Sequence, residues 1–233
     1  NNKFTLMKKI GIIVLSLFMQ TILAQTNRFV YQVTMKPDAS DKNDIKTENA
    51  YLDISQEKSV FYSENRIKRD SVIQATIQSG GARGFNRDQM QNLRSIINYS
   101  VEKDKKNQKT IFKDRIGRDV YTYDEDRPLN WKIMQETTKI GEYKVQKAET
   151  DFAGRKWTAW FTNDIPVNDG PYIFHDLPGL IITITDNDED YNFNLIQIKK
   201  SANLFDARVK PIIIDWNKYK ELASSYYQNP NEE

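Results

Sequence analysis

The chain has 233 residues, no cysteine and a formal net charge of +2, with 28% charged, 39% hydrophobic and 12% aromatic residues. The absence of cysteine excludes thiol catalysis, thiolate metal sites and lipid attachment to a cysteine. The nearly balanced charge lacks the basic excess typical of nucleic-acid-binding proteins, so we expect no nucleic-acid partner.

The first 24 residues are typical of a short upstream extension followed by a secretory signal peptide. Lys8 and Lys9 precede an apolar run from Ile10 to Phe18, and Ala24 is a small residue at a suitable cleavage position. This run is shorter than the roughly 20 residues that cross a membrane. We therefore expect an exported protein, periplasmic or associated with the outer membrane, without a transmembrane span after processing. Residues 25–233 are expected to form one β-rich domain.

The first part of this domain alternates between apolar and polar residues, which predicts strands with one face in water. The strands predicted here are 27–35, 51–54 and 59–62. A polar stretch predicts a loop at 36–46, and weaker helical spacing predicts helices at 65–78 and 88–97. A glycine-rich break at 80–84 separates the two helices.

Alternation returns after residue 98 and continues almost to the C-terminus. Further strands are predicted at 99–102, 110–113, 119–123, 131–136, 143–149, 155–161, 180–186 and 191–198, and a helix at 217–226. We therefore predict a mainly β, β-rich α+β fold. It is a single curved antiparallel sheet of about nine or ten strands with a few helices, including one at the C-terminus. The sequence leaves open whether the sheet forms an open sheet, a half barrel or a closed barrel.

A loop rich in proline and glycine lies between the last two predicted hairpins and ends in Asp176-Leu177-Pro178-Gly179-Leu180-Ile181. Together with Phe152-Ala153-Gly154-Arg155 and Ala159-Trp160-Phe161-Thr162, it resembles the GLPGLI family of exported Bacteroidetes proteins. The first glycine of the family hexapeptide is Asp176 here, and aspartate tolerates left-handed backbone, so we expect the turn to persist. The resemblance implies an exported, β-rich envelope protein with an accessory role beside a TonB-dependent outer-membrane receptor.

Two interpretations of this loop remain open. In the first, its prolines and glycines shape the backbone, and its apolar residues pin the loop to the sheet. In the second, the loop is a rigid exposed edge that binds a partner. The candidate partner surface consists of Trp160, Pro166, Gly170, Pro171, Phe174, Asp176, Leu177, Pro178, Gly179, Leu180 and Ile181.

Groups suited to catalysis are few. His175 is the single histidine, so any hydroxyl–imidazole–carboxylate relay needs it, and Asp176 is adjacent to it in sequence only. No nucleophile motif accompanies the histidine. We interpret His175 as a loop residue and predict no catalytic residue and no cofactor.

Three alternating carboxylates, Asp186, Asp188 and Asp190, form a weak candidate for a calcium site because Ca²⁺ prefers oxygen ligands. Tyr191 and Gln197 stand where an EF-hand loop has glycine and glutamate. A solvated turn is the simpler interpretation of the same residues.

These observations favour an exported, non-enzymatic envelope protein that assists outer-membrane transport by binding a partner or an apolar ligand. A TonB-dependent outer-membrane receptor is the expected partner. One alternative is a hydrolase that acts on envelope glycan or peptide through paired carboxylates. The other is a calcium-stabilised surface module.

Overall fold

The structure is a computed structural model that describes residues 26–37, 41–79, 87–201 and 210–228. The predicted leader at 1–24 and the glycine-rich break at 80–84 lie outside these ranges.

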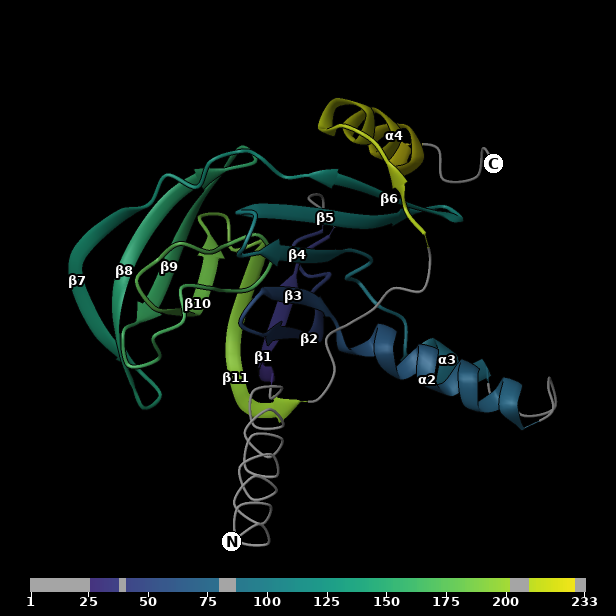
Figure 1. Cartoon of the computed structure of the whole chain (residues 1–233), viewed down its shortest axis with the longest axis horizontal. Helices are drawn as coiled ribbons and strands as arrows, with labels where there is room; N and C mark the ends of the chain where they lie inside the picture. The colour runs from purple at the N-terminus through teal and green to yellow at the C-terminus, as the bar shows by residue number, and fades with distance from the viewer. Residues whose placement is uncertain (1–25, 38–40, 80–86, 202–209, 229–233) are drawn as a thin grey trace, which may run out of the picture.

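Twelve strands form one sheet in the order β12-β6-β5-β4-β3-β2-β1-β11-β10-β9-β8-β7 (Figure 1). Their bounds are β1 Thr26–Met35, β2 Lys46–Ile54, β3 Lys58–Ser63, β4 Ser100–Asp104, β5 Lys109–Ile116, β6 Asp119–Asp124, β7 Lys132–Ile140, β8 Tyr143–Phe152, β9 Arg155–Thr162, β10 Leu180–Asp186, β11 Tyr191–Ser201 and β12 Ile212–Ile213. The sheet ends at β12 and β7, so it is open. This confirms the mainly β prediction, with more strands than the nine or ten expected. Among the described strands, the short β12 is the one that pairs in parallel, with β6.

The central strand β1 shows why alternation predicted the sheet correctly. It pairs antiparallel with β2 and β11. Its side chains therefore point alternately to the two faces. The predicted apolar face of β1 is buried in the main core, and its members are Phe29, Tyr31, Val33 and Met35.

The opposite face of the sheet carries a smaller apolar cluster. This cluster comprises Val30, Tyr51, Val60 and Tyr62, and Ile67 of helix α2 (Glu64–Gln78) packs on it. The helix begins after Ser63, whose hydroxyl accepts a hydrogen bond from the Arg66 amide. Such a cap satisfies a backbone donor that helix geometry leaves free. The predicted helix at 65–78 is thereby confirmed.

The predicted helix at 88–97 is wrong in its second half, because helix α3 spans only Arg87–Asn92. The amide of Ile96 donates to the Glu48 carboxylate at 2.7 Å, and the amide of Ile97 donates to the Ser95 hydroxyl at 3.0 Å. These bonds replace the bonds to preceding carbonyl groups that a helix requires. Ile97 is instead fully buried in the main core.

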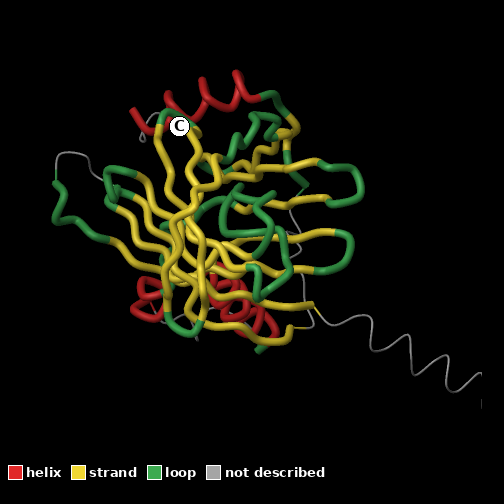
Figure 2. Tube along the Cα trace, turned by 90° about the vertical axis from the view of Figure 1, so that its left-hand side faces the viewer, coloured by secondary structure: helices red, strands yellow, loops and turns green. Residues whose placement is uncertain are grey.

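The C-terminal helix α4 (Trp216–Gln228) confirms the helix predicted at 217–226 and covers the β6 end of the core face. Figure 2 shows the strands between α4 above and the other helices below. The Tyr219 ring lies 4.8 Å from the Tyr123 ring, and its hydroxyl donates to the Asp114 carboxylate at 2.7 Å. Burial raises the pKa of Asp114 above its ordinary value, although the bond from Tyr219 opposes that effect.

Replacing Asp114 with asparagine should stabilise the protein at neutral pH. The pKa of the Asp114 carboxyl group is higher in the folded state than in the unfolded state. Its contribution to stability is therefore fully present below the unfolded pKa and is lost as the pH rises through the folded pKa. The neutral amide avoids that loss, so the free energy of unfolding should exceed that of the wild type at pH 7 and match it at about pH 3. Urea unfolding at both pH values measures the difference, with Asp119→Asn as an exposed control. An equal gain at both pH values would contradict this explanation.

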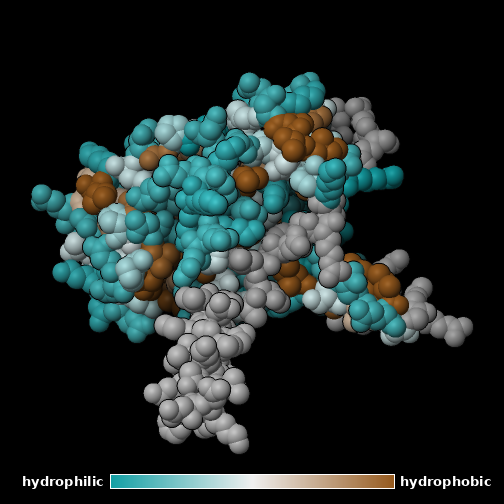
Figure 3. Space-filling model, in the orientation of Figure 1, coloured by the Kyte–Doolittle hydropathy of each residue, from teal (hydrophilic) through white to brown (hydrophobic). Residues whose placement is uncertain are grey.

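Among the described residues, no helix is long and apolar enough to cross a membrane. The face seen in Figure 3 is mainly hydrophilic, with hydrophobic patches near α4 and on α2. The described surface therefore offers isolated apolar patches on this face.

Candidate functional site

The proline- and glycine-rich loop at 163–179, between β9 and β10, lies against the core face of the sheet. Ile173, Phe174 and Leu177 are fully buried there. The Phe174 ring lies 4.7 Å from the Trp157 ring of β9, and Trp131 donates its indole N–H to the His175 carbonyl at 2.8 Å. The loop is therefore part of the hydrophobic core, as the first interpretation of its sequence requires.

Lys103 of β4 anchors this loop from inside the protein. Its ammonium group donates to the Asp169 carboxylate at 2.7 Å and to the carbonyl groups of Gly170 at 2.6 Å and Phe174 at 3.0 Å. Lys103 is 6% exposed and Asp169 is 3% exposed. Three acceptors match the three N–H donors of an ammonium group. Burial lowers the pKa of Lys103, and the charge of Asp169 opposes this shift.

Two backbone conformations shape the end of the loop. Asp176 has φ 70°, which confirms that aspartate accepts the left-handed turn at this position. Gly179 has φ 154°, and a Cβ atom there would lie 2.0 Å from the Thr162 carbonyl oxygen. Only glycine allows β9 and the loop to approach so closely.

The candidate partner surface divides into buried and accessible residues. The buried members are Gly170, Pro171, Phe174, Leu177, Gly179, Leu180 and Ile181. Trp160 is half-buried, while Pro166, Asp176 and Pro178 are exposed. Within this candidate surface, a partner that binds the folded protein can therefore reach only Trp160, Pro166, Asp176 and Pro178.

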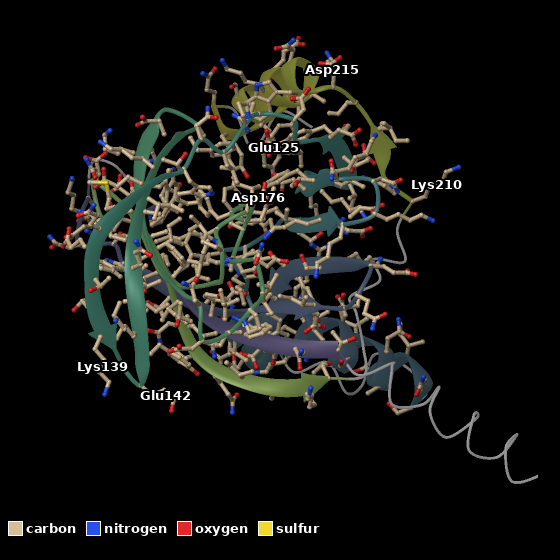
Figure 4. The ribbon with its side chains drawn as sticks, turned by 60° about the vertical axis from the view of Figure 1, so that its left-hand side comes forward. Glu125, Lys139, Glu142, Asp176, Lys210 and Asp215 are labelled. Carbon is tan, nitrogen blue, oxygen red and sulfur yellow. The ribbon has the colours of Figure 1, made fainter. Side chains whose placement is uncertain are left out.

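A cavity of about 720 Å³ lies between this loop and the β4–β5 hairpin. Its polar lining includes Lys103, Lys109, Thr110, Asp169, His175 and Asp176. Figure 4 shows Asp176 near the middle of the molecule, whereas Lys139 and Glu142 lie at the distant tip of the β7–β8 hairpin. We call this space the polar cavity.

Three polar side chains form a relay at the polar cavity. The Nδ1 atom of His175 lies 2.8 Å from a carboxylate oxygen of Asp176, and Nε2 lies 3.2 Å from the Thr110 hydroxyl. The sequence showed His175 and Asp176 as neighbours but gave no sign of Thr110, which lies 65 positions earlier. A hydroxyl–imidazole–carboxylate order is the arrangement that nucleophilic hydrolases use.

The three acidic residues of the calcium candidate do lie together, with one oxygen of each within 4.8 Å of the others. Arg155 lies among them: its Nη1 donates to Asp186 and to Asp190, and approaches Asp188 at 3.9 Å. The guanidinium group lowers the pKa of Asp190. Sequence reasoning missed Arg155, whose positive charge already lies against all three carboxylates.

Replacing Arg155 with alanine should create calcium dependence. Without the guanidinium group, repulsion among the three carboxylates should lower the melting temperature, and about 1 mM CaCl₂ should restore part of it. The wild type should show no calcium effect in differential scanning fluorimetry with and without EDTA. Lys156→Ala, which removes a more exposed neighbouring charge, serves as the control. An equal calcium effect in the wild type would show that the metal binds beside Arg155.

Comparison with known proteins gives one family match and a similarity of fold. A family model described as "Protein of unknown function (Porph_ging)" matches residues 152–183, which span β9, the loop and the start of β10. No curated protein is similar to the chain.

Two solved structures, "Structure of PNGF-II in C2 space group" and "Structure of PNGF-II in P21 space group", resemble the chain with a TM-score of 0.56 each. Sequence identities are 19% and 18% over 85% of this chain. The similarity covers 32% and 33% of those proteins, so this chain spans about a third of their length. At this identity, the similarity shows a shared fold.

Proposed function

We propose that this protein is a non-enzymatic binding protein of the Bacteroidetes cell envelope that holds a small polar ligand in the polar cavity. The observation that carries the proposal is the cavity itself. Its volume of about 720 Å³ lies within the range of ligand pockets, about 300–1,000 Å³. Its lining of lysine, histidine, threonine and aspartate side chains suits a polar ligand better than the apolar one expected from the sequence.

Hydrogen bonds hold two walls of the polar cavity in place, which supports binding. On one side, Lys103 joins the loop to β4 through three hydrogen bonds. On the other, residues 100–104 and 109–113 form a regular antiparallel hairpin. A preformed site avoids the entropic cost of ordering loops when a ligand binds.

The resemblance to the GLPGLI family and the predicted leader support an envelope location. The family match at 152–183 covers the same segment that carries this resemblance. In this proposal the protein works beside a TonB-dependent outer-membrane receptor, and the exposed loop residues Pro166, Asp176 and Pro178 are available for that contact.

Purification of the tagged protein from its own envelope in mild detergent tests the proposal. Mass spectrometry should find a stoichiometric small molecule, and a receptor among the co-eluting proteins. Val167→Trp should lose the small molecule because Val167 lines the polar cavity and the larger side chain would fill it. Lys139→Ala, remote from the cavity, should retain it (Figure 4). Equal recovery from Val167→Trp, with an unchanged melting temperature, would contradict binding in this cavity.

The relay at the polar cavity favours a hydrolase as a second candidate. Thr110 Oγ would attack an ester or amide carbonyl and pass its proton to His175 Nε2. The imidazolium would then protonate the leaving group, and water would release the acyl product from Thr110. Asp176 would orient the imidazole through Nδ1.

If this candidate is correct, the protein should release p-nitrophenolate from p-nitrophenyl acetate. Thr110→Val and His175→Ala should each reduce the rate about 100-fold or more. Thr138→Val, an exposed substitution on β7, should leave the rate unchanged. Equal rates in all three variants would exclude the relay.

A further inference from the structure

A second cavity, of about 290 Å³, lies apart from the polar cavity and shares no lining residue with it. We call it the aromatic cavity. Six of its lining residues are aromatic: Tyr99, Phe152, Trp157, Tyr172, Tyr191 and Phe193. Ala153 and Arg155, at the β8–β9 turn, complete the lining.

Tyr172 is held in the aromatic cavity by an uncommon backbone conformation. Its φ is 56°, which is rare for a bulky side chain. In this conformation its ring stacks on Phe193, with an interplanar angle of 8°, and meets Tyr99 edge-on at 5.3 Å. The loop therefore presents an aromatic ring to the cavity instead of to solvent.

Three tyrosine hydroxyls are available at the aromatic cavity. Among the described residues, none donates to or accepts from the hydroxyl groups of Tyr99, Tyr172 or Tyr191. Burial raises the pKa of Tyr99 and of Tyr172, and the neighbouring phenol groups raise each further. At neutral pH Tyr99 and Tyr172 therefore remain uncharged. A phenol hydroxyl group can both donate and accept a hydrogen bond.

The charged groups beside the aromatic cavity are already paired. Arg155 lies 4.9 Å over the Tyr191 ring and is bound to Asp186 and Asp190. Arg127 lies 4.6 Å over the Phe152 ring and is bound to Glu125. The Arg127–Glu125 pair is neutral, and the three carboxylates around Arg155 leave that cluster with a net negative charge, so neither group attracts an anion. Their outer N–H groups and oxygens can still bond to hydroxyl groups.

The chemistry of the lining selects among ligands. A purely apolar ligand would bury the tyrosine hydroxyls without partners, which costs free energy. An anionic ligand would meet no unpaired positive charge, and the lining residues include no carboxylate that could hold a cation. A ring with apolar C–H faces and hydroxyl groups on its edge satisfies both the aromatic faces and the hydroxyls.

We infer that the aromatic cavity binds one neutral sugar ring, stacked on the aromatic side chains and hydrogen-bonded to Tyr99, Tyr172 and Tyr191. This site is independent of the polar cavity and of the function proposed for it. Its small volume limits the bound portion to about one ring of a glycan or glycoside.

Titration of the purified protein with sugars tests this inference, because Trp157 lines the cavity and reports on its occupancy. The probes are the methyl glycosides of glucose, galactose and mannose, N-acetylglucosamine, glucose 6-phosphate and indole. At least one neutral sugar should change the tryptophan fluorescence saturably and release heat in calorimetry. Glucose 6-phosphate and indole should bind more weakly.

Tyr99→Phe and Tyr172→Phe keep the rings and remove one hydroxyl each, and each should weaken sugar binding about tenfold. Ala153→Asn should also weaken it, because asparagine accepts the φ of 52° at that turn while its side chain narrows the cavity. Tyr121→Phe, which does not line the cavity, should bind normally.

Three results would overturn the inference. The first is the absence of saturable binding of any neutral sugar at about 10 mM. The second is sugar binding that survives all three cavity substitutions but is lost in His175→Ala, which would assign the sugar to the polar cavity. The third is indole binding more tightly than every sugar. Circular dichroism of each variant separates loss of the site from loss of the fold.

Discussion

Replacing Lys103 with methionine should lower the free energy of unfolding by about 3–5 kcal/mol, because it leaves the buried Asp169 carboxylate without its counter-charge. The carbonyl groups of Gly170 and Phe174 lose the same donor. The melting temperature should fall by roughly 10 °C. Urea and thermal unfolding, followed by circular dichroism, measure both quantities.

Lys109→Met provides a matched control on the same hairpin. Lys109 pairs with Asp124, but both side chains are more than half exposed, and such pairs contribute about 0–1 kcal/mol. The double variant Lys103→Met with Asp169→Leu removes both buried charges and should regain much of the lost stability. A loss in Lys103→Met no larger than in Lys109→Met would show that the buried pair does not hold the loop.

Replacing Gly179 with alanine should cost about 3 kcal/mol or more. At φ 154° an L side chain is strained, and the added Cβ would lie 2.0 Å from the Thr162 carbonyl oxygen. Because the contact is to backbone, β9 and the loop must separate to relieve it. The free energy of unfolding and the amide exchange rates of residues 163–181 measure the result.

Gly141→Ala separates backbone strain from the steric clash. Gly141 also has a positive φ, 59°, but a Cβ atom there meets nothing within 4 Å. This substitution should cost only about 1–2 kcal/mol. Equal losses in the two variants would mean that the close approach to Thr162 contributes little to stability.

Both predictions concern the same property of the loop at 163–179. Its proline and glycine residues guide the backbone, its apolar side chains fill the core face, and Lys103 neutralises the buried carboxylate of Asp169. The loop thus contributes to the lining of both cavities, through Asp176 in the polar cavity and Tyr172 in the aromatic cavity. Mutations in this loop should weaken ligand binding by destabilising the fold, so a binding defect needs a stability measurement beside it.

The strands were predictable from the amino-acid sequence, because the alternation that marks a strand is a local property. The strands 27–35, 143–149 and 155–161 were all predicted close to their observed positions. The left-handed turn at Asp176 was also predictable, since it depends on the backbone preference of one residue.

Which polar side chains meet depends on the three-dimensional fold. Lys103 and Asp169 are 66 positions apart, Thr110 and His175 are 65 apart, and Arg155 reaches Asp186 across 31 positions. The order of strands in the sheet determines which of these residues lie close together in space. Periodicity along one strand carries no information about that order. For the same reason the open sheet, the inward position of the loop and both cavities became visible only in three dimensions.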